Sequence, residues 1–212
     1  MNKELRKFYI TGLVLLSLAL SLNVLASSKT CIHSKEIFND YEPKIFPKTN
    51  NLLRKQGQRP ILCGTKLIIR GKLLDSKCTP VSDAKVQIWH VGCDGKYPYE
   101  LLRNHKKHHA LTNLDSDSTF LGAGTTITDN NGEFIFITIV PPPINTKAPV
   151  AHLRFSGEFF GEFETAIALS KDDIQNKYFN HCDKTDTSEI DEDFVINEIS
   201  VVLPYSNPLK EF

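Results

Sequence analysis

From residue 63 onward the chain consists of short apolar runs separated by turn residues. In residues 84–88, three apolar side chains alternate with Lys85 and Gln87, and this period of two marks a half-buried strand. Similar runs predict strands at 66–74, 84–88, 125–128, 134–139, 151–155, 165–169 and 199–203, whereas only 99–108 and 170–179 favour helix. Several strands with turns between them predict an all-β fold, either a sandwich or a barrel.

Two turns indicate how neighbouring strands pair. Residues 75–83 contain Pro80 and short polar side chains, so we expect an antiparallel hairpin between 66–74 and 84–90. Residues 129–132 read Asp-Asn-Asn-Gly, and these residue types tolerate the positive φ of a tight hairpin turn. The second turn therefore predicts a hairpin that returns along 134–139.

The first hairpin bears on the disulfides. Antiparallel pairing places Cys63 opposite Cys93 at one end of the sheet. Cys78 would then lie at the other end, about 20 Å away at about 3.3 Å per strand residue, which is beyond the reach of a disulfide. We therefore expect a bridge between Cys63 and Cys93.

The N-terminal part of the chain lacks this strand pattern. Residues 1–26 combine a basic front, a long apolar stretch and small or branched residues before Ser27, and so predict a cleaved signal peptide. A retained membrane anchor is the alternative, because the apolar run of about 18 residues is long enough to be considered. Residues 27–60 contain several prolines and charges without a sustained period, and predict an extended arm.

Charge and cysteine content limit the partners and the compartment. Lys plus Arg and Asp plus Glu each number 25, so nothing in the balance favours nucleic acid or an anionic membrane surface. The leader predicts export to the periplasm or the extracellular space, with no membrane contact after cleavage. An oxidising compartment would pair some of the five cysteines, and their odd number leaves one thiol free or bridged to another chain.

Three motifs occur in a characteristic order. Residues 80–90 read PVSDAKVQIWH and are followed by GKY at 95–97; residues 128–134 read TDNNGEF; and residues 151–155 read AHLRF. In order and wording they resemble the intradiol ring-cleavage dioxygenases, the catechol and protocatechuate type, over about residues 60–205.

The resemblance implies a fold and a reaction. It implies a single-domain antiparallel β-sandwich over 61–205, preceded by the arm and followed by a short tail at 206–212. It also implies a non-haem Fe(III) ion, held by two tyrosines and two histidines, that activates a catechol-like aromatic for ring opening by O2. Members often use such an arm in dimers, so the resemblance is compatible with a homo-oligomer.

The residues that match the ligand positions are only partly of the expected type. Tyr97 matches the first tyrosine and His152 the first histidine, whereas Arg154 stands at the second histidine and Ile144 at the second tyrosine. Pro149 replaces an arginine that members often carry three residues before the first histidine. Alternate residues of a strand share a face, so Arg154 would face the ion, and two unit charges ~4 Å apart repel by about 4 kcal/mol at a protein-like dielectric.

Two hypotheses account for these departures. In the first, the protein is an exported intradiol-type dioxygenase with a rebuilt site, to which Tyr99, His108 and His109 are candidate additional ligands. The alternative for these two histidines, which we favour, is a solvated basic loop. In the second, it is a catalytically inactive secreted binding or assembly module on the same scaffold, and Arg154 binds a carboxylate. Tyr97 and His152 would then serve only in packing and hydrogen bonding.

Overall fold

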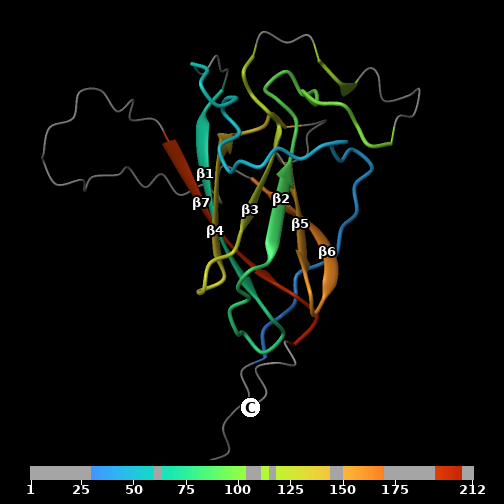
Figure 1. Cartoon of the computed structure of the whole chain (residues 1–212), viewed down its shortest axis with the longest axis vertical. Coiled ribbons are helices and arrows are strands. Elements are labelled where there is room, and N and C mark those ends of the chain that lie inside the picture. Colours follow the sequence, from blue (N-terminus) through green and yellow to red (C-terminus); the bar gives the residue numbers. More distant parts are fainter. Residues whose placement is uncertain are drawn as a thin grey trace, which may run out of the picture. The chain divides into compact units, whose positions relative to one another are not determined.

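Seven strands form two facing sheets in the computed structural model of the chain, which describes residues 30–59, 64–103, 111–114, 118–143, 150–169 and 194–206 (Figure 1). The strands are β1 (Lys66–Leu74), β2 (Lys85–Trp89), β3 (Ala123–Ile127), β4 (Glu133–Ile139), β5 (Val150–Gly157), β6 (Gly161–Ala168) and β7 (Phe194–Val202). Each contains or overlaps a strand predicted from the sequence, because the period of two marks sheet positions wherever one face is buried. No helix occurs in the described part of 99–108, and 170–179 lies outside the described residues.

One sheet has the order β4-β1-β7 and the other β3-β2-β5-β6. All ladders are antiparallel except that between β1 and β7, which is parallel. A parallel pair needs a long crossover in place of a tight turn. The architecture confirms the predicted β-sandwich, with one parallel ladder added.

The core lies between the inner faces of the two sheets. Along β1 the side chains of Leu67, Ile69 and Leu73 are fully buried, whereas the alternating positions are partly or fully exposed. Phe134 stacks edge-on against Phe155 of the opposite sheet, with ring centroids 5.6 Å apart. Gly71 is needed beneath this contact, because a Cβ there would lie 2.0 Å from the Phe134 ring.

The predicted hairpin between 66–74 and 84–90 is wrong, because β1 and β2 belong to different sheets. The chain begins a hairpin, with the Val81 N–H donating to the Leu73 carbonyl, but β4 already pairs with Lys66–Lys72 of β1 and β7 pairs with the other edge. Asp83 then adopts a φ of 58°, and the Asp83 N–H donates to the Thr128 carbonyl of the other sheet.

The turn at 129–132 forms as predicted, with Gly132 at a φ of 71°, and its N–H donates to the Asp129 carbonyl. The strands that it joins nevertheless belong to different sheets, since β3 pairs with β2 and β4 with β1. The turn is a corner of the sandwich, and the hairpin predicted there within one sheet is a second correction.

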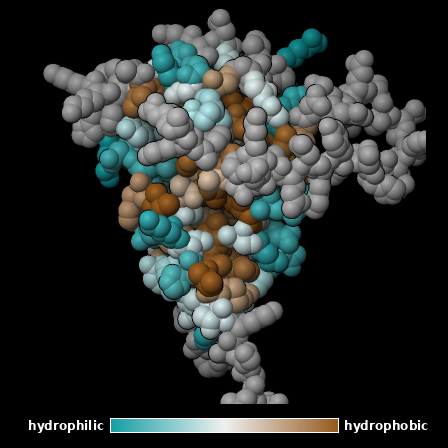
Figure 2. Space-filling model, turned by 180° about the vertical axis from the view of Figure 1, so that it is seen from behind, coloured by the Kyte–Doolittle hydropathy of each residue, from teal (hydrophilic) through white to brown (hydrophobic). Residues whose placement is uncertain are grey.

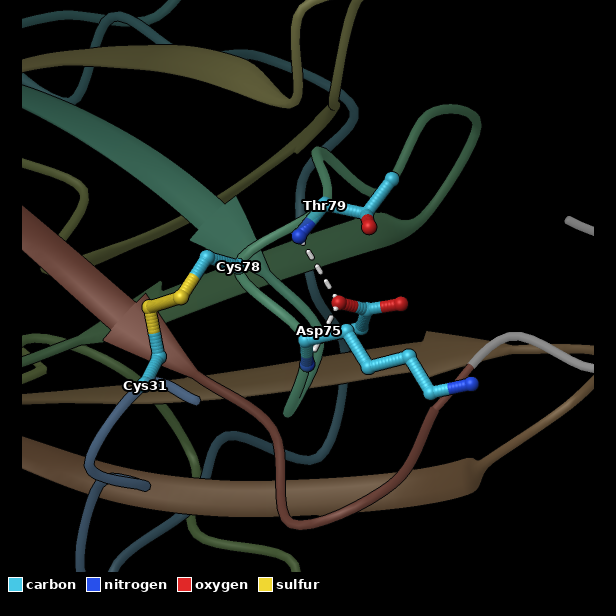
Figure 3. The surroundings of a disulfide bond; sticks show 5 residues. Cys31, Asp75, Cys78 and Thr79 are labelled. Carbon is cyan, nitrogen blue, oxygen red and sulfur yellow. Dashed lines mark hydrogen bonds between the residues drawn. A yellow bond between two sulfur atoms is a disulfide. The ribbon is translucent and has the colours of Figure 1, made fainter. Parts of the chain in front are cut away.

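The arm predicted for residues 27–60 is extended where it is described, and it is tied to the sandwich at both ends. At its start a disulfide joins Cys31 to Cys78 in the turn after β1, where the Asp75 carboxylate accepts the backbone N–H of Thr79 (Figure 3). Near its end Leu52 is fully buried in the core, and its backbone bonds to Ile137 of β4.

On the face opposite to that of Figure 1, the described surface carries hydrophobic side chains among hydrophilic ones (Figure 2).

The cysteine prediction is tested only in part. Cys78 pairs with Cys31, and so not with Cys93. Cys93 is disulfide-bonded, and its partner lies outside the described residues. A Cβ at Gly64 would lie 3.8 Å from the Cβ of Cys93, which places the neighbour of Cys63 close by. The Cys63–Cys93 bridge stays a prediction.

Candidate functional site

The outer face of the β3-β2-β5-β6 sheet carries His152 and Arg154. In β5 the inward side chains are Ala151, Leu153 and Phe155, all fully buried, so the two alternating residues point away from the core. The register sets Trp89 of β2 opposite His152. The sequence prediction that positions 152 and 154 share one face is confirmed.

Tyr97 reaches the same face from the loop after β2. A tight turn closes with the Gly92 N–H donating to the Lys96 carbonyl over 2.7 Å, and Gly95 has the positive φ that this turn requires. The backbone of Tyr97 is then held on both sides, since its N–H donates to Leu111 and its carbonyl accepts from Asn113. The phenol is therefore placed by backbone bonds and is buried.

Asn39 of the arm lies between His152 and Tyr97. Its Nδ2 is 2.5 Å from the Nε2 of His152, and its side chain also hydrogen-bonds with Tyr97. The Asn39 Oδ1 accepts the backbone N–H of Tyr41, which fixes the amide so that its nitrogen faces the imidazole. The two candidate ligands thus converge on one side chain.

Burial sets the protonation of both candidate ligands. It lowers the pKa of His152 to about 4, so the ring is neutral near pH 7 and Nε2 accepts from Asn39. The proton then sits on Nδ1, which is buried and has no hydrogen-bond partner among the described residues. Burial also raises the pKa of Tyr97 to about 12, which outweighs the opposite effect of the hydrogen bond with Asn39.

Arg154 is paired with two carboxylates. It binds Glu42 of the arm, and its Nη2 lies 3.3 Å from Oε2 of Glu164, its cross-strand partner on β6. The Arg154 and Glu42 side chains are 15% exposed and that of Glu164 is 7% exposed, so the three charges are largely shielded from water. Burial lowers the pKa of Arg154, but its bonds to the two carboxylates outweigh that effect and leave the pKa raised.

Aromatic rings enclose the site. Trp89 is fully buried and stacks on His152 with ring centroids 5.5 Å apart, while the guanidinium of Arg154 lies 5.4 Å from the Trp89 ring centroid. Tyr41 of the arm stacks on Tyr97 at 5.4 Å. The outer face of the sheet therefore carries a packed aromatic cluster at this point, covered by the arm.

Two neighbouring groups have separate roles. His90 is buried with both ring nitrogens bonded, Nδ1 to the Val91 carbonyl and Nε2 to the Thr138 hydroxyl, so it is a packed histidine. Burial lowers its pKa to about 4. The Tyr99 hydroxyl donates to the Tyr41 carbonyl over 3.3 Å, and burial raises the pKa of Tyr99 well above its usual value.

Sequence reasoning missed Asn39, Glu42 and Glu164. The two arm residues belong to no local sequence pattern. They lie more than 100 positions before their partners in β5, and only the folded chain brings them together. Glu164 could have been predicted from strand pairing, because a carboxylate directly opposite an arginine on the neighbouring strand forms a favourable pair. That prediction required the β5–β6 register, which is set by the turn between Gly157 and Gly161.

The chain was compared with known proteins. The Dioxygenase_C family model, described as "Dioxygenase", matches residues 39–156. A Rickettsia felis protein named "Putative dioxygenase" is 41% identical over 169 residues, which cover 76% of this chain and 79% of that protein. The protocatechuate 3,4-dioxygenase beta chain of Burkholderia cepacia is 31% identical over 106 residues, which cover 46% of this chain and 41% of that protein.

Solved structures agree. An intradiol ring-cleavage dioxygenase from Tetranychus urticae superposes with a TM-score of 0.55 at 17% identity, covering 84% of this chain and 98% of that one. Catechol 1,2-dioxygenase from Pseudomonas arvilla C-1 gives 0.55 at 16% identity, covering 84% and 64%. The chain belongs to the intradiol ring-cleavage dioxygenase family.

Membership in this family implies a ferric ion, and the residues present can be tested for their fit to it. Tyr97 and His152 supply a phenol oxygen and an imidazole nitrogen, the donors that a hard trivalent ion takes, and both face one point. Arg154 does not fit, because a guanidinium has no lone pair to give. Within the described ranges, no group of three or more His, Cys, Asp or Glu side chains forms a metal site. His108, His109, Ile144 and Pro149 lie outside the described residues.

A cavity of about 680 Å³ opens beside Tyr99, and its lining includes Tyr99 and Pro98. Its walls include the apolar side chains of Ile45, Phe120 and Leu121, together with the cations Lys55 and Arg59. Its volume falls in the range that small-molecule sites commonly have.

In the part of the chain that the structure describes, no helix is long and apolar enough to cross a membrane.

Proposed function

We propose that this protein is an intradiol-type dioxygenase that binds Fe(III) and cleaves the ring of a catechol-like aromatic with O2. Family membership supports the reaction class, and curated relatives of similar length carry a dioxygenase name. Tyr97 and His152 would hold the ion, and Tyr99, His108 or His109 would complete its coordination. When bound, the ion supplies the Lewis acidity that draws a catechol into the site as its phenolate.

One observation carries the proposal. The loop that holds Tyr97 and the strand that holds His152 are distant in sequence, yet both side chains meet at the amide of Asn39. The aromatic residues around this point suit an aromatic ligand. Trp89, Tyr41 and Tyr99 provide flat apolar surfaces, and burial keeps water from the imidazole.

The ion pairs of Arg154 reduce the charge conflict that the sequence predicted. The guanidinium is turned toward Glu42 and Glu164 and lies beside the Trp89 ring. Two carboxylates against one guanidinium leave the cluster without excess positive charge. A cation near Tyr97 and His152 would therefore meet a compensated arginine, and repulsion would fall well below the roughly 4 kcal/mol of an unpaired charge at close range.

Iron binding tests the proposal. The mature protein, incubated with excess ferric salt and then desalted, should retain iron and gain the visible absorption of a phenolate bound to Fe(III). Tyr97→Phe should lose most of that absorption, whereas Tyr205→Phe, a change at an exposed tyrosine, should keep it. Wild-type protein that retains no iron would contradict the proposal.

A second function is favoured by a specific observation. The Arg154 cluster is compatible with the inactive binding module. Arg154 stands at the position of a ligand histidine, and its guanidinium already binds a carboxylate of the protein, that of Glu42. In that case iron content stays at zero, Tyr97→Phe changes nothing, and Arg154→Ala weakens the binding of a ligand or partner. Iron uptake by wild-type protein would rule this function out.

Export is part of the proposal. The basic and apolar segments of residues 1–26 support a leader that directs the protein to the periplasm or outside the cell. The disulfide between Cys31 and Cys78 is compatible with an oxidising compartment. Expression with a C-terminal tag in a bacterial host should give mature protein that begins near Ser27 in the exported fraction, and full-length protein confined to the cytoplasm would contradict it.

A further inference from the structure

Four consecutive residues of the arm cover the candidate site, and we call residues 39–42 the latch. Asn39 bonds His152 and Tyr97, and its backbone N–H donates to Glu164 over 2.8 Å. Tyr41 stacks on the Tyr97 ring. Glu42 binds Arg154. Three of the four latch residues thus contact the residues on which the proposed function depends.

The latch and a ligand of the site exclude each other. The Nε2 lone pair of His152 is directed at the Asn39 amide over 2.5 Å, so no other atom can reach it while Asn39 stays. The Tyr97 hydroxyl is engaged by the same amide, and one face of its ring is covered by Tyr41. Any ion or aromatic that uses His152 and Tyr97 must first displace Asn39.

The chain around the latch allows it to move and return. The Cys31–Cys78 disulfide ties the arm before the latch, and the Lys44 N–H bond to the Glu100 carbonyl holds the arm just after it. The Leu102 N–H bond to the Glu42 carbonyl holds the backbone at the last latch residue, so the Glu42 side chain can swing away from Arg154 about a fixed point. If Glu42 leaves, Arg154 still has Glu164, so opening does not leave a buried charge without a partner. Asp40 pairs with Arg103 at the surface, with both side chains more than half exposed.

We propose that residues 39–42 are an autoinhibitory latch that closes the His152–Tyr97 site until its Asn39 and Glu42 contacts are broken. This inference rests on the proposed function for what enters the site, but the closure itself is a property of the folded chain. The latch then controls access to the site by an equilibrium between a closed and an open arm.

Trp89 reports on the latch without any metal. It is the one tryptophan of the sequence, it is fully buried, and it lies against His152 and beside Arg154. Asn39→Ala removes the side-chain hydrogen bonds to the neutral His152 and Tyr97, and Glu42→Gln removes the charge from the bond to Arg154. Each variant should raise the rate of acrylamide quenching of Trp89 by about tenfold, because the interactions that it loses together contribute a factor of about that size. Glu36→Gln removes the same charge from an exposed arm position and should leave quenching at the wild-type rate.

Quenching equal to wild type in both latch variants, with far-ultraviolet circular dichroism and cooperative melting retained, would overturn the latch. Should one variant fail to fold, the other still decides the matter. Equal increases in the latch variants and in Glu36→Gln would also overturn it, because the arm would then respond to any charge change.

Iron uptake separates the latch from the proposed function. Growth of the ferric–phenolate absorption after addition of ferric salt should be about tenfold faster in Asn39→Ala than in wild type. Uptake at one common rate would overturn the latch and keep the function. Faster quenching without iron in any variant would support the latch and overturn the function.

Discussion

Burial governs the titratable side chains of the site. His90 and His152 are held neutral in the sandwich, and both have a pKa near 4. Tyr97 stays protonated for the same reason. A buried group is stable in its charged form only when a partner stands beside it, and among these residues Arg154 alone has such partners.

The buried histidines predict a pH dependence of stability. A histidine with a pKa of about 4 in the fold and 6.5 when unfolded binds fewer protons in the native state, so stability falls as pH drops from about 6.5 to 4. His90 alone should account for up to about 3 kcal/mol of that loss. Urea unfolding at pH 7.5 and pH 4.5 should show a smaller difference for His90→Gln than for wild type. His152, with a similarly lowered pKa, should contribute in the same direction. An unchanged difference would contradict the role of His90.

Arg154 predicts a large effect of truncation. Arg154→Ala leaves Glu42 and Glu164 close together without a cation, in a site where their side chains are 15% and 7% exposed. We expect the free energy of unfolding to fall by about 3 kcal/mol, as in other pairs that lose one buried partner. Arg70→Ala serves as a control at an exposed position of β1. Chemical denaturation at pH 7 measures the free energy of unfolding of both variants. If Arg154→Ala lost as little stability as Arg70→Ala, the ion pairs of Arg154 would not stabilise the fold.

Single elements show what the sequence could predict. Strand positions followed from alternation, because a half-buried strand must place apolar side chains at every second residue. Their pairing did not follow, since it depended on which distant strands take each sheet edge. β4 and β7 occupy the two edges of β1, and Asp83 adopts a positive φ where the chain crosses to the other sheet. The turn at 129–132 was recognised, but a turn sequence does not state which sheets it connects.

The candidate site divides in the same way. Tyr97, His152 and Arg154 were found because motif order carries them, and their common face followed from strand geometry. Asn39 and Glu42 were not found, because the arm has no period and reaches the site only through long-range contacts.

The arm gives a prediction about its covalent tie. The Cys31–Cys78 disulfide spans 47 residues of sequence, and a loop of that length restricts the unfolded chain by up to about 4 kcal/mol. The double variant Cys31→Ser/Cys78→Ser should therefore melt several degrees lower than wild type. Differential scanning calorimetry without reductant measures the change. An unaltered melting temperature would show that the arm does not stabilise the sandwich through this bond.

The arm also depends on a glycine in β3. A Cβ at Gly124 would lie 2.4 Å from the Thr49 carbonyl oxygen and 2.8 Å from Leu52, both in the segment that seals the edge between β3 and β4. Gly124→Ala should lower the free energy of unfolding by about 2 kcal/mol, because backbone cannot yield as a side chain does. Gly95→Ser, where a Cβ meets open space but φ is positive, provides a contrast. Equal effects in urea titrations would argue against this close approach.

For the whole molecule, fold and chemistry differ in how far they are shared. The family's sandwich is present from β1 to β7, and relatives of similar length are 41% identical. At the candidate site, Arg154 stands where the motif resemblance places a histidine, and two ligand candidates converge on an asparagine of the arm. The same scaffold can serve many chemistries, so the site must decide between the two proposed functions.

Retained iron in the purified mature protein is the most direct measurement. After ferric loading and desalting, wild type should hold iron and absorb visible light through a bound phenolate, and His152→Ala and Tyr97→Phe should each lose most of both signals. Iron-free, colourless wild-type protein, or equal iron in wild type and both variants, would contradict a ferric site built on Tyr97 and His152.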